Sequence, residues 1–177
     1  MKLLPILFLA PGFLLATLAS GQTGPETANA IIYNRNGERI GAATFTVVRG
    51  AGVKIGLDVH GLPPGLHGLH IHSKGQCEPP EFDSAGPHFN PQHRQHGLRN
   101  PQGPHAGDLG NLQVGTNGQA HVVILDPRLS LASGNPNSIL RPGGASLVIH
   151  AQPDDELSDP SGNSGKRIAC GVISIIR

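Results

Sequence analysis

The stretch GLHGLHIHSKGQC, residues 65–77, brings together three histidines and a cysteine. His70 and His72 are two residues apart, so in an extended strand their side chains leave the same face of the sheet. Two imidazoles on one face form half of a metal site, because imidazole is a common ligand for copper and zinc. His150, which ends the apolar run SLVIH, is a third candidate for this site.

A second group of candidate ligands lies in the stretch GPHFNPQHRQHGLRNPQGPHAGDLGN, residues 86–111. Three imidazoles and one carboxylate there could complete a tetrahedral shell: His88, His96, His105 and Asp108. A shell without a place for water is typical of a structural zinc site. Residues 74–108 show neither helix nor strand periodicity, and bound metal would supply the free energy that orders so long a loop.

The elements that must position these ligands are short strands. Glycine and proline make up 41 of the 177 residues, about 23%, where about 12% is usual. Eight strand-like runs lie between them: NAIIYNR, GAATFTVVR, VKIGLDV, LHGLHIHS, NLQVG, QAHVVILD, ASLVIHA and RIACGVISII. Because no helix is indicated, the pattern predicts an antiparallel sandwich or barrel. A second irregular loop, QPDDELSDPSGNSGK, precedes the last strand.

The first two dozen residues form a segment of another kind. MKLLPILFLAPGFLLATLAS has one early lysine, an apolar stretch and then small residues resembling a signal-peptidase site. We expect a signal peptide over residues 1–21 with cleavage near Ala19–Gly21, a flexible segment over 22–28 and one domain over 29–177. An uncleaved anchor is the alternative, which the prolines in the apolar stretch disfavour. After cleavage we expect no stable membrane insertion.

The two cysteines, Cys77 and Cys170, favour a single disulfide if the protein is exported, because extracytoplasmic compartments are oxidising. Two free, buried thiols are the alternative. The formal net charge is +1, and no run of lysine or arginine suggests a phosphate-binding surface. We therefore expect no nucleic-acid partner.

Taken in order, the motifs resemble those of the copper/zinc superoxide dismutases. The segments GLHGLHIH, CEPP, AGPHFNP, PHAGDLGN, SLVIHA and GNSGKRIACGVI are similar to that family's motifs, from about residue 30 to the end. The resemblance implies an eight-stranded antiparallel Greek-key β-barrel with a metal-binding loop and an electrostatic loop. It also implies an oxidoreductase that converts superoxide into molecular oxygen and hydrogen peroxide, with one copper and one zinc per subunit.

The resemblance implies a role for each site residue. Four histidines match copper ligands: His70, His72, His88 and His150. Four residues match zinc ligands: His88, His96, His105 and Asp108. His88 would thus bridge the two ions and carry protons in the reaction. Asp154 matches a carboxylate that links a copper ligand to a zinc ligand. Arg167 matches the guanidinium that holds the superoxide anion, and Cys77–Cys170 matches the disulfide.

The other four histidines match no metal ligand of the family. His67 matches a residue with a structural role in the family, and His93 is left over between the ligands. His60 and His121 are expected to be exposed. The loop between His150 and Arg167 is shorter than in the animal and plant enzymes and has no clear counterpart of their channel lysine.

The position of one cysteine bears on localisation and assembly. The position of Cys77 resembles that in bacterial exported members more than in eukaryotic ones. We therefore expect a periplasmic, secreted or cell-envelope-associated protein, and a homodimer remains open.

Two other classes of protein use similar residues. An exported copper or zinc buffer, or a metallochaperone, would use the same ligands without turnover but would need neither Arg167 nor Asp154. A zinc hydrolase needs an open zinc position and a general base, and the sequence offers no HExxH motif or spare carboxylate at ligand spacing.

Overall fold

A computed structural model describes residues 26–175 of the chain, so the predicted signal peptide, residues 1–21, lies outside the described residues. The strands are β1 (Thr27–Asn34), β2 (Arg39–Val48), β3 (Gly52–Val59), β4 (Gly65–His72), β5 (Asp108–Val114), β6 (Ala120–Asp126), β7 (Ser146–His150), β8 (Arg167–Val172) and β9 (Ser174–Ile175). Within these residues the one helical turn is the 3-10 turn η1 (Asp83–Ala85). No helix in residues 26–175 combines the length and apolarity needed to span a bilayer.

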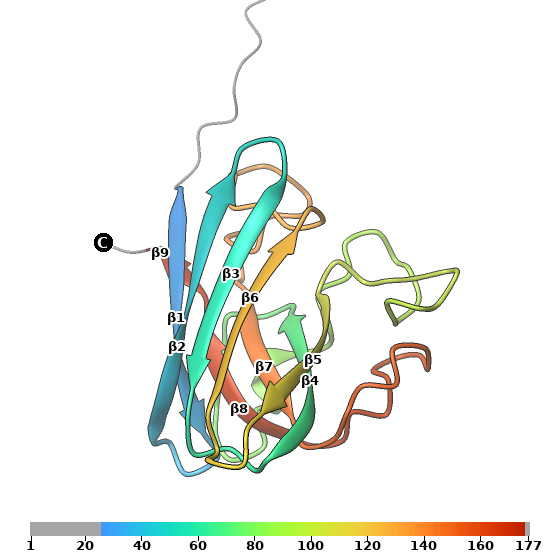
Figure 1. Cartoon of the computed structure of the whole chain (residues 1–177). Helices are drawn as coiled ribbons and strands as arrows, with labels where there is room; N and C mark the ends of the chain where they lie inside the picture. The colour runs from blue at the N-terminus through green and yellow to red at the C-terminus, as the bar shows by residue number, and fades with distance from the viewer. Residues whose placement is uncertain (1–25, 176–177) are drawn as a thin grey trace, which may run out of the picture.

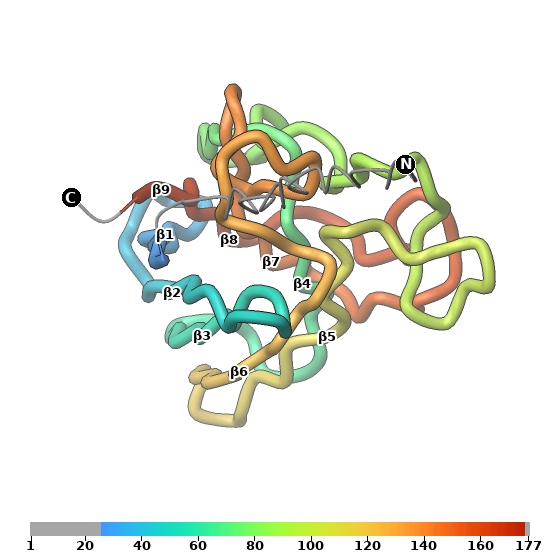
Figure 2. Tube along the Cα trace, turned by 90° about the horizontal axis from the view of Figure 1, so that it is seen from above, coloured from blue at the N-terminus to red at the C-terminus, as the bar shows by residue number. Residues whose placement is uncertain are grey.

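The strands form one antiparallel sheet that curls into a nearly closed barrel (Figure 1). Hydrogen-bonded neighbours follow the order β5-β4-β7-β8-β1-β2-β3-β6, and β9 pairs with β1. Seen from above, β1, β2, β3 and β6 form one side of the ring, while β8, β7, β4 and β5 form the other (Figure 2). The β3–β4 and β6–β7 connections cross between these sides, which gives Greek-key connectivity. The predicted all-β Greek-key barrel is confirmed, and the last predicted strand divides into β8 and β9.

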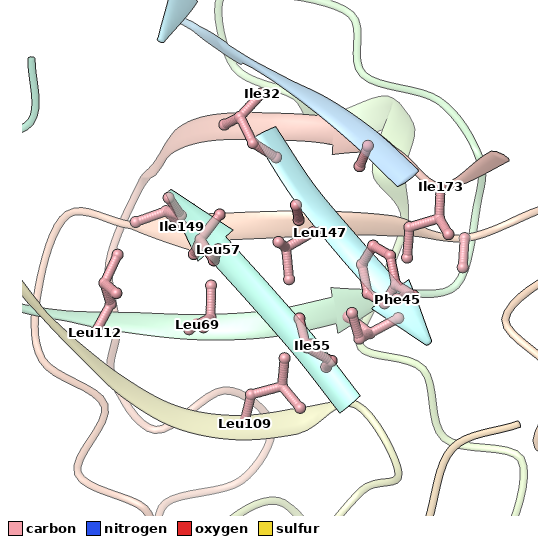
Figure 3. Close-up of a cluster of buried hydrophobic side chains, with 14 of the residues drawn as sticks. Ile32, Phe45, Ile55, Leu57, Leu69, Leu109, Leu112, Leu147, Ile149 and Ile173 are labelled. Atoms are coloured by element: carbon pink, nitrogen blue, oxygen red, sulfur yellow. The ribbon is translucent and has the colours of Figure 1, made fainter. Parts of the chain in front are cut away.

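The core is formed by alternate residues of strands from both sides of the barrel. On β3, Val53, Ile55 and Leu57 are buried, whereas the intervening Lys54 is exposed, as the period of two requires. Figure 3 shows Ile55 and Leu57 facing side chains of the opposite layer, which include Leu69, Leu147 and Ile149. Burying each such side chain contributes about 1.5–3 kcal/mol to folding.

Strands β4 and β7 are buried on both of their faces. Their inner residues join the core, and two long loops, residues 73–107 and 151–166, pack over the outer side. These loops extend from the same side of the barrel in both views (Figures 1 and 2). They are joined through their backbones, since the N–H of Arg99 donates to the carbonyl of Glu156 at 3.0 Å. The outward histidines of β4 are therefore covered by protein.

A disulfide ties the first of these loops to the barrel. Cys77 is bonded to Cys170 of β8, and their Cα atoms are 5.7 Å apart across 93 residues of sequence. Phe82 and Val148 are buried in the same cluster as Cys170. The predicted disulfide is confirmed, and the alternative of two free thiols is wrong.

We expect loss of this bond to destabilise the barrel. Replacing both cysteines by serine releases a closed loop in the unfolded chain, and the chain-entropy model sets the loss at up to roughly 4–5 kcal/mol. Urea unfolding of the metal-free mature protein measures it. A reducing agent should lower the midpoint of the wild-type protein and leave the double-serine variant unchanged. A wild-type midpoint that is insensitive to reduction would contradict the prediction.

Candidate metal centre

The first ligand group combines two histidines of β4 with one from β7 and one from the covering loop. β4 pairs with β7, so His70 lies opposite Val148 and His72 opposite Ser146, close to His150. His88 follows the disulfide loop and bridges to His72 through the backbone. One ring nitrogen from each histidine lies within 4.8 Å of those of the others, and all four rings are buried: His70, His72, His88 and His150.

One nitrogen of each of three rings is bonded outward, and this sets how each ring is turned. His72 Nδ1 lies 2.8 Å from the carbonyl oxygen of Gly86, and His150 Nδ1 lies 3.1 Å from that of Gly165. His70 Nε2 lies 2.8 Å from the carboxylate of Asp154. The nitrogens left for a shared ion are Nδ1 of His70 and Nε2 of His72 and His150, of which the last two are 3.3 Å apart.

Within residues 26–175, two buried nitrogens of this first group have no hydrogen-bond partner, namely Nδ1 of His70 and Nε2 of His88. A buried polar atom without a partner costs free energy, so such atoms are rare in native proteins. A cation bound by four imidazole nitrogens removes this cost. The donor set is nitrogen-only, which suits copper. The residues therefore fit a copper ion.

The second ligand group converges on a single carboxylate oxygen at the start of β5. Asp108 Oδ1 lies 3.0 Å from Nδ1 of His88, 3.0 Å from Nδ1 of His96 and 3.3 Å from Nδ1 of His105. Its other oxygen, Oδ2, accepts the backbone N–H groups of Gly97 and His105, both at 2.9 Å. Three imidazoles and a carboxylate thus surround one point, and the donor set fits tetrahedral zinc.

His88 belongs to both groups. Its Nδ1 faces Asp108, and its Nε2 is one of the two nitrogens of the first group that have no partner within residues 26–175. By distance alone, His70 takes the place of His105 in a group within 4.8 Å that contains His88, His96 and Asp108, and the rings of His70 and His88 are 4.0 Å apart. Since Asp154 already holds Nε2 of His70, only its Nδ1 is available, and His105 supplies the nitrogen directed at Asp108.

Asp154 connects the two groups. Its Oδ2 lies 2.8 Å from His70 Nε2 and its Oδ1 lies 2.9 Å from His96 Nε2, so one carboxylate fixes a ring on each side. Gly162 leaves room for it, because a Cβ there would lie 1.7 Å from Oδ1 at a positive φ of 63°. Asn111 holds the backbone of Asp154 through two hydrogen bonds of 2.7 and 2.8 Å.

Arg167 lies at the start of β8, next to the first ligand group. Its Nη1 donates to the carbonyl of Phe82 at 2.6 Å, and its Nη2 donates to the carbonyl of Gly86 at 2.7 Å. The Gly86 oxygen also faces Nδ1 of His72, so the guanidinium and this ring share one acceptor. Burial lowers the pKa of Arg167, although the group stays charged.

The electrostatics keep the first ligand group neutral. Burial is the main cause that lowers the pKa of His88 to about 4 and that of His150 to about 3. Burial also acts on His96, but hydrogen bonds to Asp108 and Asp154 outweigh it and raise the pKa of His96 to about 9. Burial opposes ionisation of Asp108, yet hydrogen bonds from three rings hold its pKa well below the usual range.

The remaining histidines lie away from the two groups. His67 is buried, and each of its nitrogens is 2.8 Å from a backbone carbonyl oxygen, of His150 and of Pro63, in keeping with a structural role. His60 and His121 are exposed, as expected, and His93 is exposed too. Sequence reasoning missed Asn111 and the carbonyl of Gly86. The former stands in the motif DLGN, but a backbone carbonyl carries no signal in the sequence.

Comparison with known proteins agrees with this geometry. The sequence profile of the copper/zinc superoxide dismutase family matches residues 39–173. A copper/zinc superoxide dismutase of Aquifex aeolicus is 50% identical over 147 residues, which cover 82% of this chain and 85% of the relative. An extracellular copper/zinc superoxide dismutase of Brugia pahangi is 39% identical over 162 residues, covering 86% and 78% of the two chains. The crystal structure of a SOD-like protein from Bacillus subtilis has a TM-score of 0.80 at 42% identity, covering 84% of this chain and 97% of that one.

The barrel and its two adjoining ligand groups define a Greek-key β-barrel protein with a paired metal centre. With a profile match over most of its length and a relative at 50% identity, the chain belongs to the copper/zinc superoxide dismutase family. It is an oxidoreductase of the kind that dismutates superoxide with copper and zinc.

We expect the metal-free protein to lose stability as the pH falls below about 6.5. The unfolded chain then binds protons at His88, whereas the folded chain stays neutral there down to its pKa of about 4. At about 1.4 kcal/mol per pKa unit, His88 alone accounts for at most about 3 kcal/mol. His96 has the opposite effect on stability. Its stabilising contribution is fully present below pH 6.5 and is lost as the pH rises through its pKa of about 9.

Urea unfolding in the presence of a chelator, at a series of pH values, measures this dependence. His150→Gln should flatten the slope between pH 6.5 and 3, because it removes one neutral ring. The matched control is His60→Gln, which changes an exposed histidine. Equal slopes for both variants and the wild-type protein would contradict the assignment.

Proposed function

We propose that this chain is an exported superoxide dismutase whose copper is held by His70, His72, His88 and His150. Its zinc is held by four residues, of which the first is shared with copper: His88, His96, His105 and Asp108. The observation that carries the proposal is the position of His88, which has one ring nitrogen in each ligand group. With both ions bound, this shared imidazole would link a redox-active site to a structural one.

When bound, copper supplies the one-electron change between two oxidation states that dismutation requires, and zinc supplies only structure. The protein then has to bind a small anion, position it and deliver protons. Two superoxide ions and two protons give one molecule of oxygen and one of hydrogen peroxide. One superoxide is oxidised and the other is reduced, so the electrons balance without an external reductant.

His88 is suited to hold and release a proton at Nε2. Its other nitrogen is fixed by the Asp108 group, so the ring keeps its place whether or not Nε2 carries a proton. Within residues 26–175 Nε2 has no hydrogen-bond partner, so it is available to exchange a proton with an anion that approaches the first ligand group. His88 is therefore proposed as both ligand and proton carrier.

Arg167 is proposed to hold the superoxide anion beside the copper ligands. Two of its N–H donors are bonded to the carbonyls of Phe82 and Gly86, and a guanidinium has five N–H donors in all. The others are left for charge-assisted hydrogen bonds to a diatomic anion. The two carbonyls also prevent the side chain from turning away, which reduces the entropy lost when the anion binds.

We expect Arg167→Ala to retain both metals and to slow dismutation about 10-fold or more, because a hydrogen bond to a charged group contributes about 1.5–3 kcal/mol. His88→Ala should abolish activity and weaken the binding of both ions. The assay is inhibition of superoxide-dependent cytochrome c reduction, with metal content and an electron paramagnetic resonance spectrum from the same samples.

Arg49→Ala serves as the matched control, because the side chain of Arg49 is 89% exposed and, among residues 26–175, its one ion pair is with Glu26. Full activity of Arg167→Ala at physiological ionic strength would rule out the anchor role. A wild-type protein that binds both ions tightly without inhibiting cytochrome c reduction would instead be a metal carrier.

Export is proposed from three observations of different kinds. The amino-terminal sequence resembles a signal peptide, the disulfide is of the kind that persists in oxidising compartments, and one relative is an extracellular enzyme. The role that follows is protection against superoxide outside the cytoplasm. The periplasm, the cell envelope and the medium are all consistent with it, and a homodimer stays a prediction.

Expression of the full chain in a bacterial host should yield a processed protein outside the cytoplasm. Its mass should correspond to cleavage between residues 19 and 22, with the Cys77–Cys170 disulfide formed. A variant with charged residues placed in the apolar stretch should remain unprocessed and in the cytoplasm. If the wild-type chain were instead recovered from the cytoplasm with residues 1–21 still attached, the proposal of export would be wrong.

A further inference from the structure

Arg128, in the loop that follows β6, contacts the backbone of two residues of the zinc group. Its Nη1 donates to the carbonyl oxygen of His105 at 3.0 Å, and its Nη2 donates to that of Asp108 at 2.6 Å. A guanidinium carries a permanent charge and is not a zinc ligand. Its effect on the site therefore passes through the main chain that carries the ligands.

Asp126, the last residue of β6, holds Arg128 in this orientation. It is only 2% exposed, and its Oδ1 accepts the Nε–H of Arg128 at 2.9 Å and the backbone N–H of Arg128 at 2.8 Å. Its Oδ2 accepts an Nη2–H at 2.5 Å. The fork of the guanidinium is thus fixed on one side by a carboxylate and on the other by two carbonyls, a pattern that lysine cannot reproduce.

These contacts cross the seam of the barrel. β5 and β6 are the two ends of the hydrogen-bonded strand order, and no ladder is recorded between them in residues 26–175. At one end of the seam, the turn over residues 115–119 joins the two strands directly. At the other end, the side chain of Arg128 links the end of β6 to Asp108, the first residue of β5.

We propose that Arg128, held by Asp126, is a positioning residue that presets the zinc site across this seam. It fixes the main chain at His105 and Asp108, and the turn between them is closed by a hydrogen bond from the Asp108 N–H to the His105 carbonyl at 3.3 Å. With the backbone fixed, Asp108 Oδ1 stays within 3.0–3.3 Å of all three ring nitrogens. The inference rests on the proposed assignment of His105 and Asp108 as zinc ligands.

Two variants of the mature chain test this role. Arg128→Lys keeps a positive charge beside buried Asp126, but the three N–H donors of one ammonium cannot replace the four side-chain hydrogen bonds that the guanidinium makes. Asp126→Asn combined with Arg128→Met removes both charges and leaves no unpaired carboxylate in the interior. Zinc affinity, measured by competition with a chromophoric chelator, should fall about 10-fold in the first and up to about 100-fold in the second. The matched control, Arg49→Lys, should bind zinc as the wild-type protein does.

A second readout separates positioning from general stabilisation. At a fixed zinc concentration, zinc raises the melting temperature by an amount that grows with the logarithm of its affinity for the folded protein. In both variants this zinc-induced rise should shrink, whereas a purely structural role would lower the melting temperatures of the metal-free and zinc-loaded proteins equally. If the double variant fails to fold without metal, Arg128→Lys decides the question alone.

The outcomes distinguish this inference from the proposed function. If the wild-type protein takes up zinc and Arg128→Lys binds zinc with wild-type affinity, only the positioning role is overturned. A wild-type protein that takes up no zinc overturns both the positioning role and the zinc-site assignment. A lowered zinc affinity with an unchanged affinity of the zinc-free protein for copper supports the positioning role.

Discussion

The centre depends on one constraint, which is that the buried imidazole rings of the first ligand group are held by the surrounding protein through one nitrogen only. Each of His70, His72 and His150 has one nitrogen facing a carboxylate or a carbonyl oxygen, and its other nitrogen faces the remaining rings. Neutral rings arranged in this way present lone pairs to each other, which is unfavourable without a cation between them. Burial holds the pKa values low, so protons cannot easily substitute for the metal. The site is thus preorganised for an ion at the expense of the metal-free state.

The same constraint explains why long loops without regular structure can be ordered on the barrel. The carbonyl that orients His72 belongs to Gly86 of one loop, and the carboxylate that orients His70 belongs to Asp154 of the other. Folding the loops and orienting the rings are therefore the same event. The disulfide adds a covalent limit, since Cys77 anchors the segment that carries Phe82 and Gly86, whose carbonyls hold Arg167. A bond remote from the ligands thus restricts where the guanidinium of Arg167 can lie.

The sequence predicted the strands well, and for a clear physical reason. Period-two burial on β3 and the same-face pair on β4 are local properties, and each is visible within a few residues. The ligand set was predicted from residue types and from the resemblance, and the structure brings those side chains together. The splitting of the last strand into β8 and β9 was not predictable, because it depends on long-range pairing: β8 pairs with both β7 and β1, whereas β9 pairs with β1. The backbone carbonyl acceptors at Phe82, Gly86 and Gly165 could not be predicted for a different reason. Every residue has a carbonyl group, so the sequence does not mark the ones that are used.

The distinction between an enzyme and a metal store depends on groups that bind no metal. A store gains nothing from a guanidinium that shares an acceptor with a ligand ring, since a nearby positive charge weakens cation binding. The Coulombic effect of Arg167 lowers the pKa of both His72 and His150, in addition to the larger effect of burial. A guanidinium fixed by two carbonyls beside the ligand rings instead suits an anionic substrate that approaches the same nitrogens.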